Sequence, residues 1–213
     1  MSGIRSFRNI QRNTLVDELL TYMETQLPSF TVSDDFVEIL TLTDNEDQHT
    51  EALCNFMVFQ QHPLRFNFLR EKSQKGNRTV DIGIYLKGGV LLFTLEAKVL
   101  PTPLTGDRKE HEYVFGKGGG IQRFKDENHG VDNQGRLLPD NGMIAYVKKH
   151  SFDHWHSSIN EWVLDAFWSE KEKLKKVSFD KIARLTSVHP RIGDSKVTLH
   201  HFWLNVNDTQ LSD

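Results

Sequence analysis

The sequence predicts an α/β protein in which a mixed central β-sheet carries helices on both faces. Three observations support this fold class. Residues 79–99 contain two apolar, β-branched and aromatic runs around Gly88-Gly89, which is typical of a β-hairpin. Apolar residues recur at helical spacing in 43–59, before the hairpin, and in 154–168, after it. Helices interspersed with short apolar strands are expected to form layers around one sheet.

Composition predicts one soluble domain spanning 1–213, with a core at about 43–150, an N-terminal helix and a C-terminal helix and strand. The net charge of −3 excludes a generally basic nucleic-acid coat, so any DNA contact must come from a local patch. We expect no membrane partner, because no apolar run approaches the ~20 residues of a membrane span. The basic start lacks an apolar signal core, and the single Cys54 lies in an apolar run, which favours the cytoplasm.

The elements before the hairpin are predicted from the spacing of apolar residues and from residues that end helices. Residues 14–27 read as a helix that Pro28 ends, and 36–42 fit either a strand or a short helix. Residues 43–59 are predicted to be a helix that opens with the capping box Thr43-x-x-Glu46, which assigns Glu46 to the cap. A strand over 64–69 and a polar turn over 70–78 then lead into the hairpin.

A two-residue loop at Gly88-Gly89 pairs Lys87 with Val90 and Tyr85 with Leu92, and brings Asp81 opposite Glu96. One face of this hairpin is entirely apolar, which predicts burial. The other face carries Asp81, Glu96 and Lys98, because residues two apart point to the same side. Opposed carboxylates typically cost a few tenths to about 1 kcal/mol. A divalent cation between them reverses the sign of that cost, and carboxylate oxygens suit Mg²⁺ or Mn²⁺.

The arrangement of Asp81 followed by Glu96-Ala97-Lys98 resembles the signature of the PD-(D/E)xK nuclease superfamily. The resemblance covers roughly residues 45–150, with Val80 where the signature has Pro. It implies a restriction endonuclease-like core. It also implies that Asp81, Glu96 and the backbone carbonyl of Ala97 bind Mg²⁺ or Mn²⁺.

The resemblance also implies roles for residues outside the hairpin. The helix before the hairpin often contributes a Glu to the metal site, which points to Glu51; the alternative is a solvated surface residue. Lys98 would orient the attacking water and stabilise the developing charge. Gln122, in a short helix predicted over 121–128, resembles a glutamine of the exonuclease branch, although Asp126 stands where that branch has Tyr.

Four basic residues are candidates for DNA contacts: Arg78, Lys75, Lys117 and Arg123. For the turn over 70–78 the alternative is a solvated loop. The Gly-rich run after Lys117 lacks the spacing of a P-loop.

After the hairpin, strands are predicted at 142–147 and 197–206, with a short helix at 179–185. The ten histidines lack paired ligands at zinc spacing, so a site built on His129 or on His154 and His156 is disfavoured. Cys54 is disfavoured as a nucleophile because its surroundings are apolar.

The sequence therefore predicts a Mg²⁺-dependent DNA-cleaving hydrolase, an endonuclease of restriction, defence or repair. The alternative is a non-catalytic nucleic-acid-binding or assembly subunit on a nuclease-like fold. Protein partners are left open between a homodimer and a larger defence or repair complex that needs a partner ATPase.

Overall fold

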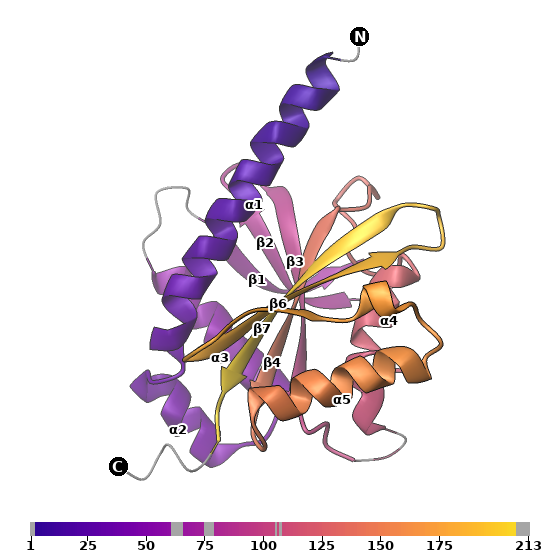
Figure 1. The fold of residues 1–213 in the computed structure, drawn as a ribbon. Coiled ribbons are helices and arrows are strands. Elements are labelled where there is room, and N and C mark those ends of the chain that lie inside the picture. The colour runs from indigo at the N-terminus through magenta and orange to yellow at the C-terminus, as the bar shows by residue number, and fades with distance from the viewer. Residues whose placement is uncertain (1–2, 61–65, 75–78, 105, 107, 208–213) are drawn as a thin grey trace.

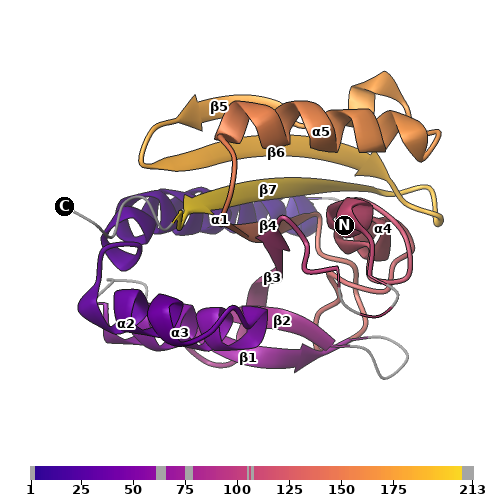
Figure 2. The ribbon, with the colours of Figure 1, turned by 90° about the horizontal axis from the view of Figure 1, so that it is seen from below.

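The computed structural model describes residues 3–60, 66–74, 79–104, 106 and 108–207, with side chains of the first helix described from residue 12 onward. A seven-stranded sheet with the order β1-β2-β3-β4-β7-β6-β5 forms the centre (Figures 1 and 2). Its strands are β1 (Asn67–Ser73), β2 (Thr79–Leu86), β3 (Val90–Leu100), β4 (Asp140–Val147), β5 (Lys175–Phe179), β6 (Ile182–Pro190) and β7 (Lys196–Asn205). The predicted α/β class with a mixed sheet is confirmed.

The sheet is mixed because its middle strands are parallel and its flanks antiparallel. β4 pairs in parallel with both β3 and β7, whereas β1-β2-β3 and β7-β6-β5 are antiparallel. The helices are α1 (Gly3–Phe30), α2 (Asp34–Leu42), α3 (Glu46–Phe59), α4 (Gly120–Lys125) and α5 (Phe152–Asp165), with 3-10 turns η2 (Glu110–Tyr113) and η3 (Glu170–Glu172). None of the helices in the described part of the chain is long and apolar enough to cross a membrane.

Helices pack on both faces of the sheet, as predicted. On one face, apolar residues of α1, α2 and α3 share a core with Ile82, Phe93 and Ala97 of the hairpin. On the other face, α4, α5 and η2 share a second core with β4, β6 and β7. Figure 1 shows α5 crossing in front of the sheet, while Figure 2 shows α2 and α3 beside β1 and β2. The hairpin therefore lies between two helical layers, and the side chains that face the second layer include Glu96 and Lys98.

Several local predictions were wrong, each because tertiary contacts overrode a local pattern. The segment 179–185 forms the turn and strands of β5 and β6 rather than a helix. The helix expected to end at Pro28 continues to Phe30, whereas 36–42 has the helix of its two alternatives. Part of the expected polar turn, from Arg70 to Ser73, belongs to β1.

Candidate active site

The hairpin of β2 and β3 has the predicted register from Ile82 to Ile84 and a different register near its turn. Gly83 faces Thr94, as predicted, but Tyr85 pairs with Leu91 and Leu86 with Val90. The loop is therefore one residue longer than expected. An irregularity between Ile84 and Tyr85 compensates for the extra residue, so the pairs on the far side of it have the predicted register. As a consequence Leu92, rather than Leu91, packs into the core shared with α1 and α3.

The side chain of Asp81, on β2, makes a hydrogen bond to the backbone of β3. The strand pairing ends with Ile82 opposite Leu95, so Asp81 and Glu96, which were expected to face each other, lie one position beyond the paired residues. Immediately beyond it, the N–H of Ala97 donates to Oδ2 of Asp81 at 2.6 Å. This bond fixes the Asp81 carboxylate beside Glu96, and both side chains line one cleft with Lys98. The three side chains that the sequence places on one face of the hairpin thus lie along the same cleft.

The cleft has a volume of about 480 Å³, and we call it the acidic cleft. Its lining consists of Glu46, Asp81, Glu96, Lys98, Arg108, Glu112, Lys117, Gly118 and Arg123. Four of these nine residues carry carboxylates, and they come from α3, β2, β3 and η2. Elements that are separated in the sequence thus bring acidic and basic side chains together in one cleft.

Glu96 is the centre of the charge network, with its side chain only 1% exposed. Its Oε1 accepts from Lys98 Nζ at 2.9 Å and from Arg123 NH1 at 2.6 Å. His129 Nε2 lies 3.3 Å from its Oε2. Burial on its own would raise the pKa of Glu96, but Lys98, His129 and Arg123 outweigh burial and hold the pKa below its usual range. Glu96 is therefore ionised at neutral pH.

Asp81 responds to the same surroundings in the opposite direction. Burial, reinforced by the charge of Glu96, raises the pKa of Asp81 to about 7, against the opposing influence of Lys98. For Lys98, burial would lower the pKa, but the carboxylates of Glu96, Glu46 and Asp81 raise it. Lys98 thus stays an ammonium, and its Nζ also donates to the carbonyl of Ala97 at 2.8 Å. That carbonyl, expected to face a metal, is turned toward Lys98 in this structure.

The acid that α3 contributes to the acidic cleft is Glu46, and of the two alternatives for Glu51 the structure favours the solvated surface residue. The Glu51 side chain is 63% exposed and lies 3.6 Å from Arg70, outside the acidic cleft. The Oε2 of Glu46 instead accepts from the N–H of Val99 on β3 at 3.0 Å. Burial, together with the charge of Glu96, raises the pKa of Glu46 despite nearby Lys98 and Arg108.

The capping role expected of Glu46 belongs to a neighbouring residue. Asn45 caps α3 by accepting from the N–H of Asp47 at 2.9 Å. The helix therefore begins at Glu46. The Glu46 side chain does not cap the helix and instead accepts a hydrogen bond from β3.

The segment around η2 closes one side of the acidic cleft. Arg108 Nε donates to Glu112 Oε2 at 3.0 Å, and Arg108 NH2 lies 3.9 Å from Glu46. Gly118 packs so closely on Glu112 that an added Cβ would lie 2.7 Å from the carboxylate Oε2. Close approach of the backbone explains the glycine at this position.

The donor chemistry of the acidic cleft fits a divalent cation. Its candidate ligands are carboxylate oxygens, which Mg²⁺ and Mn²⁺ prefer. Among the described residues, Oε2 of Glu96 is buried without a hydrogen-bond partner of good geometry, and burial together with the charge of Glu96 raises the pKa of Asp81. Within the same residues, no three His, Cys, Asp or Glu side chains already converge on one point. Cation binding therefore requires carboxylates of the cleft to rearrange.

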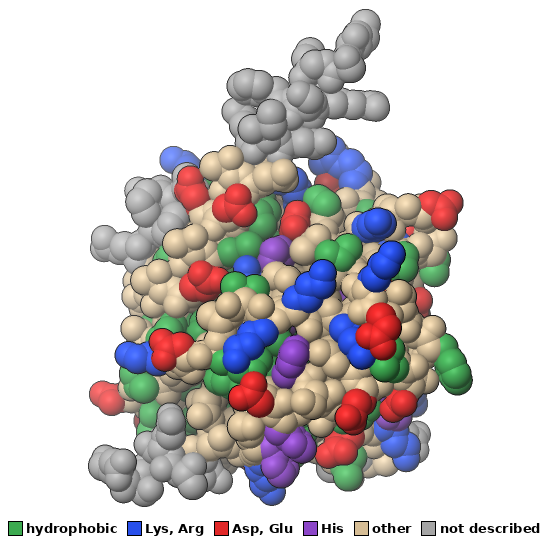
Figure 3. Space-filling model, viewed as in Figure 1, with side chains coloured by type: hydrophobic (Ala, Val, Ile, Leu, Met, Phe, Trp, Pro, Cys, Tyr) green, Lys and Arg blue, Asp and Glu red, His purple; other side chains and the backbone are tan. Residues whose placement is uncertain are grey.

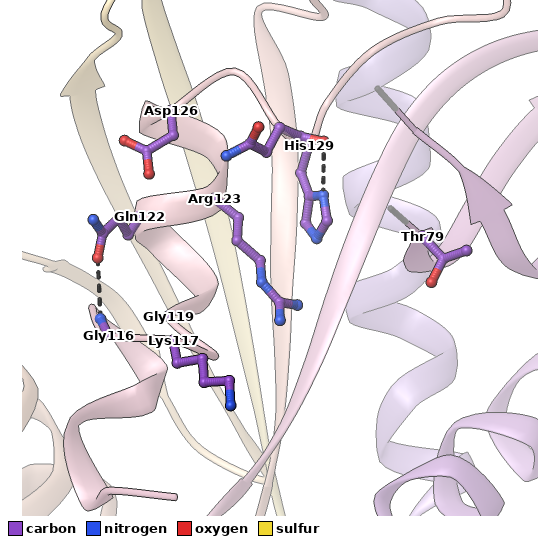
Figure 4. Close-up of a pocket in the computed structure, with 9 residues that line it drawn as sticks. Thr79, Gly116, Lys117, Gly119, Gln122, Arg123, Asp126 and His129 are labelled. Carbon is purple, nitrogen blue, oxygen red and sulfur yellow. Dashed lines mark hydrogen bonds between the residues drawn. The ribbon is translucent and has the colours of Figure 1, made fainter. Parts of the chain in front are cut away.

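A second cleft, of about 390 Å³, adjoins the first and shares Lys117 and Arg123 with it. We call it the basic cleft. It is lined by Thr79, Gly116, Lys117, Gly119, Gln122, Arg123, Asp126, Asn128 and His129 (Figure 4). Gln122 lies here rather than in the acidic cleft, and its Oε1 accepts from the N–H of Gly116 at 3.0 Å. Of the predicted DNA contacts, Lys117 and Arg123 lie at this junction, whereas Lys75 and Arg78 fall outside the described residues.

Sequence reasoning missed His129, and it assigned Cys54 correctly. The absence of zinc-type spacing around His129 left its contact with Glu96 unforeseen, because that contact joins residues distant in the sequence. Cys54 is buried, and burial raises the pKa of its thiol to about 12, which agrees with the expectation of an inert thiol.

Comparison with known proteins returned no match to any protein-family model, curated protein or solved structure. The function of this chain is therefore inferred from the geometry and chemistry of the two clefts.

Proposed function

We propose that this chain is a metal-dependent endonuclease that hydrolyses DNA phosphodiester bonds, with a restriction endonuclease-like core of the PD-(D/E)xK type. The observation that supports this proposal is the convergence of Asp81 on β2 with Glu96 and Lys98 on β3 in one cleft. The ionised Asp81 carboxylate, buried near the charge of Glu96, destabilises the fold, so a role in chemistry accounts for it better. Glu46 adds an acid from the preceding helix.

Each residue has a role that follows from its surroundings. Asp81, Glu96 and Glu46 are the proposed ligands of Mg²⁺ or Mn²⁺. When bound, the ion supplies Lewis-acid polarisation of the phosphoryl group and a more acidic water. Lys98, held as an ammonium by Glu96 at 2.9 Å, orients the attacking water and stabilises negative charge that develops on the phosphate.

Charge on the rest of the surface is consistent with local rather than global recognition of DNA. Figure 3 shows Lys and Arg side chains interspersed with Asp and Glu over the face seen in Figure 1. With a net charge of −3, attraction of a polyanion must come from segments such as the one carrying Lys117 and Arg123. The proposed biological setting is DNA restriction, defence or repair, as a homodimer or beside a partner ATPase.

One observation favours a second candidate, a non-catalytic nucleic-acid-binding or assembly subunit. Glu96 already contacts three basic side chains, those of Lys98, Arg123 and His129. If these contacts persist in the presence of Mg²⁺, Glu96 is a structural anchor rather than a metal ligand.

Incubation of the protein with supercoiled, linear and single-stranded DNA, each with Mg²⁺, Mn²⁺ or EDTA, tests the proposal. Nicking of the supercoiled plasmid that EDTA abolishes is the expected result. Degradation from the ends of linear DNA alone would replace the endonuclease with an exonuclease. DNA binding without cleavage under every condition would support the non-catalytic subunit.

A further inference from the structure

We propose that the basic cleft is a binding site for a phosphate group of the nucleic-acid strand, next to the acidic cleft where the strand is cut. This inference rests on the proposed function for the identity of the strand. The binding of phosphate itself is a property of the basic cleft, and it can be measured without metal or cleavage.

Arg123 is the main reason for this assignment. Its guanidinium lies between the two clefts, and NH1 donates to Glu96 Oε1 at 2.6 Å. The side chain remains 33% exposed. A guanidinium has five N–H donors in a planar fork that matches phosphate oxygens. Glu96 therefore fixes one edge of the fork and leaves further donors to face an anion.

The support beneath Arg123 is rigid, which reduces the entropy lost on binding. Ile121 and Phe124, its neighbours in α4, are fully buried in the second core. The backbone of α4 is tied to the preceding loop, since the N–H of Gln122 donates to the carbonyl of Val114 at 2.9 Å. Groups positioned in advance of binding contribute more affinity than mobile ones.

The remaining lining of the basic cleft is suited to an anion. Lys117 adds a second cationic side chain, and Figure 4 shows its nitrogen and the Arg123 guanidinium extending in the same direction. The oxygen of Gln122 is used by Gly116, which leaves its amide N–H groups as donors. Asp126 is the one acidic side chain of the lining. In Figure 4 its carboxylate lies at the opposite end of the cleft from those two basic groups.

Glycines shape the wall of the basic cleft. Gly116 has φ +104°, a conformation that other residues rarely adopt. A Cβ on Gly119 would lie 2.6 Å from the backbone of Phe115. The chain thus folds back tightly between Phe115 and Gly120, which places Lys117 at the junction of the two clefts.

The position beside the acidic cleft favours phosphate over other anions. A strand with one phosphodiester at the carboxylates of the acidic cleft carries further phosphates along the same backbone. Those phosphates need cationic partners within the next cleft, where the shared residues Lys117 and Arg123 lie. The ligand is either a terminal phosphate or an internal phosphodiester, which share this chemistry.

Calorimetric titration of the full chain with inorganic phosphate in EDTA tests the site. We expect saturable binding that weakens by about tenfold or more in Arg123→Gln and in Lys117→Gln, the range typical of hydrogen bonds to charged groups. Arg136→Gln is the matched control, because Arg136 is 69% exposed, pairs with Asp132 and lines neither cleft. Thermal melting of each variant separates lost binding from lost folding, and Lys117→Gln serves if Arg123→Gln fails to fold.

Competition with short oligonucleotides identifies the source of the phosphate. Stronger competition by a 5′-phosphorylated strand than by its 5′-hydroxyl counterpart assigns a terminal phosphate, and equal competition assigns an internal phosphodiester. No saturable phosphate binding by the unmodified protein, or equal binding by both cleft variants, would overturn the proposal. Lack of competition by either strand would overturn its nucleic-acid part. Phosphate binding without DNA cleavage would contradict the nuclease function and leave the anion site standing.

Discussion

Replacing Asp81 by Asn should stabilise the metal-free protein at neutral and alkaline pH. In the folded chain, burial and the charge of Glu96 raise the pKa of Asp81 to about 7, whereas an unfolded Asp titrates near 3.9. Between these values the folded state binds more protons than the unfolded state, so stability falls as pH rises. The stability contributed by the protonated carboxyl is fully present below about pH 4 and is lost as pH passes through about 7.

The size of this effect follows from the two pKa values. Between pH 5 and pH 8, ionisation of Asp81 should lower the free energy of unfolding by about 2.5 kcal/mol. The Asn variant keeps an oxygen that can accept from the N–H of Ala97, so that hydrogen bond is retained. The difference in stability between Asp81→Asn and the unmodified protein should therefore grow by about 2.5 kcal/mol over this range.

Urea denaturation in EDTA at pH 5 and pH 8 measures the effect. Asp153→Asn is a matched control, because Asp153 is 80% exposed and lies outside both clefts. Adding Mg²⁺ at pH 8 should restore stability to the unmodified protein but not to Asp81→Asn, by about 2.7 kcal/mol at one hundred times the dissociation constant. Parallel pH dependences of the two proteins would refute the assignment of a destabilised carboxylate at Asp81.

Three further predictions concern other residues of the acidic cleft. Glu46→Gln should weaken Mn²⁺ binding measured by calorimetry, while Glu51→Gln should leave it unchanged; equal effects would remove Glu46 from the ligand set. Lys98→Met should bind Mn²⁺ and DNA nearly normally. It should nick plasmid at least about a hundredfold more slowly, because about a hundredfold is the smallest rate loss typical of removing a catalytic acid or base. Unimpaired nicking would show that Lys98 has no part in the reaction. Gly118→Ala should leave the denaturation midpoint close to that of the unmodified protein, because the atoms that its Cβ would meet are the far end of the flexible Glu112 side chain, which can shift; a loss of about 2 kcal/mol, as at an overpacked site, would show that Glu112 is held in place.

The sequence was most informative where side-chain alternation and burial coincide. The strand containing Gly142 was predicted from its apolar run and the strand containing Leu199 from its alternation, and the two are neighbours within the sheet. The alternation on either side of Gly88-Gly89 placed Asp81 and Glu96 on one side of the hairpin. A shift of one residue near the turn did not propagate to the site, because the irregularity beyond Ile84 corrects it.

The misassigned residues depend on contacts between distant segments. Thr43-x-x-Glu46 has the spacing of a capping box, but Asn45 provides the cap, and Glu46 bonds to Val99 on β3. No local pattern encodes that contact. His129 likewise meets Glu96 only because α4 returns the chain to β3.

The strands after Lys173 show the same limit of local patterns. The apolar residues around Phe179 and Leu185 fit a short helix as well as they fit two strands. In the structure they form β5 and β6, which pair antiparallel, and β6 in turn pairs with β7. Pairing with neighbouring strands, which the sequence does not display, decides between these alternatives.

The rate of plasmid nicking in Mg²⁺ by Asp81→Asn, beside the unmodified protein and Glu51→Gln, tests the central claim most directly. Both changes replace a carboxylate by an amide of the same shape, but only Asp81 lies in the acidic cleft. The account predicts nicking by the unmodified protein and by Glu51→Gln, and none by Asp81→Asn. Nicking by Asp81→Asn at the unmodified rate would contradict it and place the chemistry outside the acidic cleft.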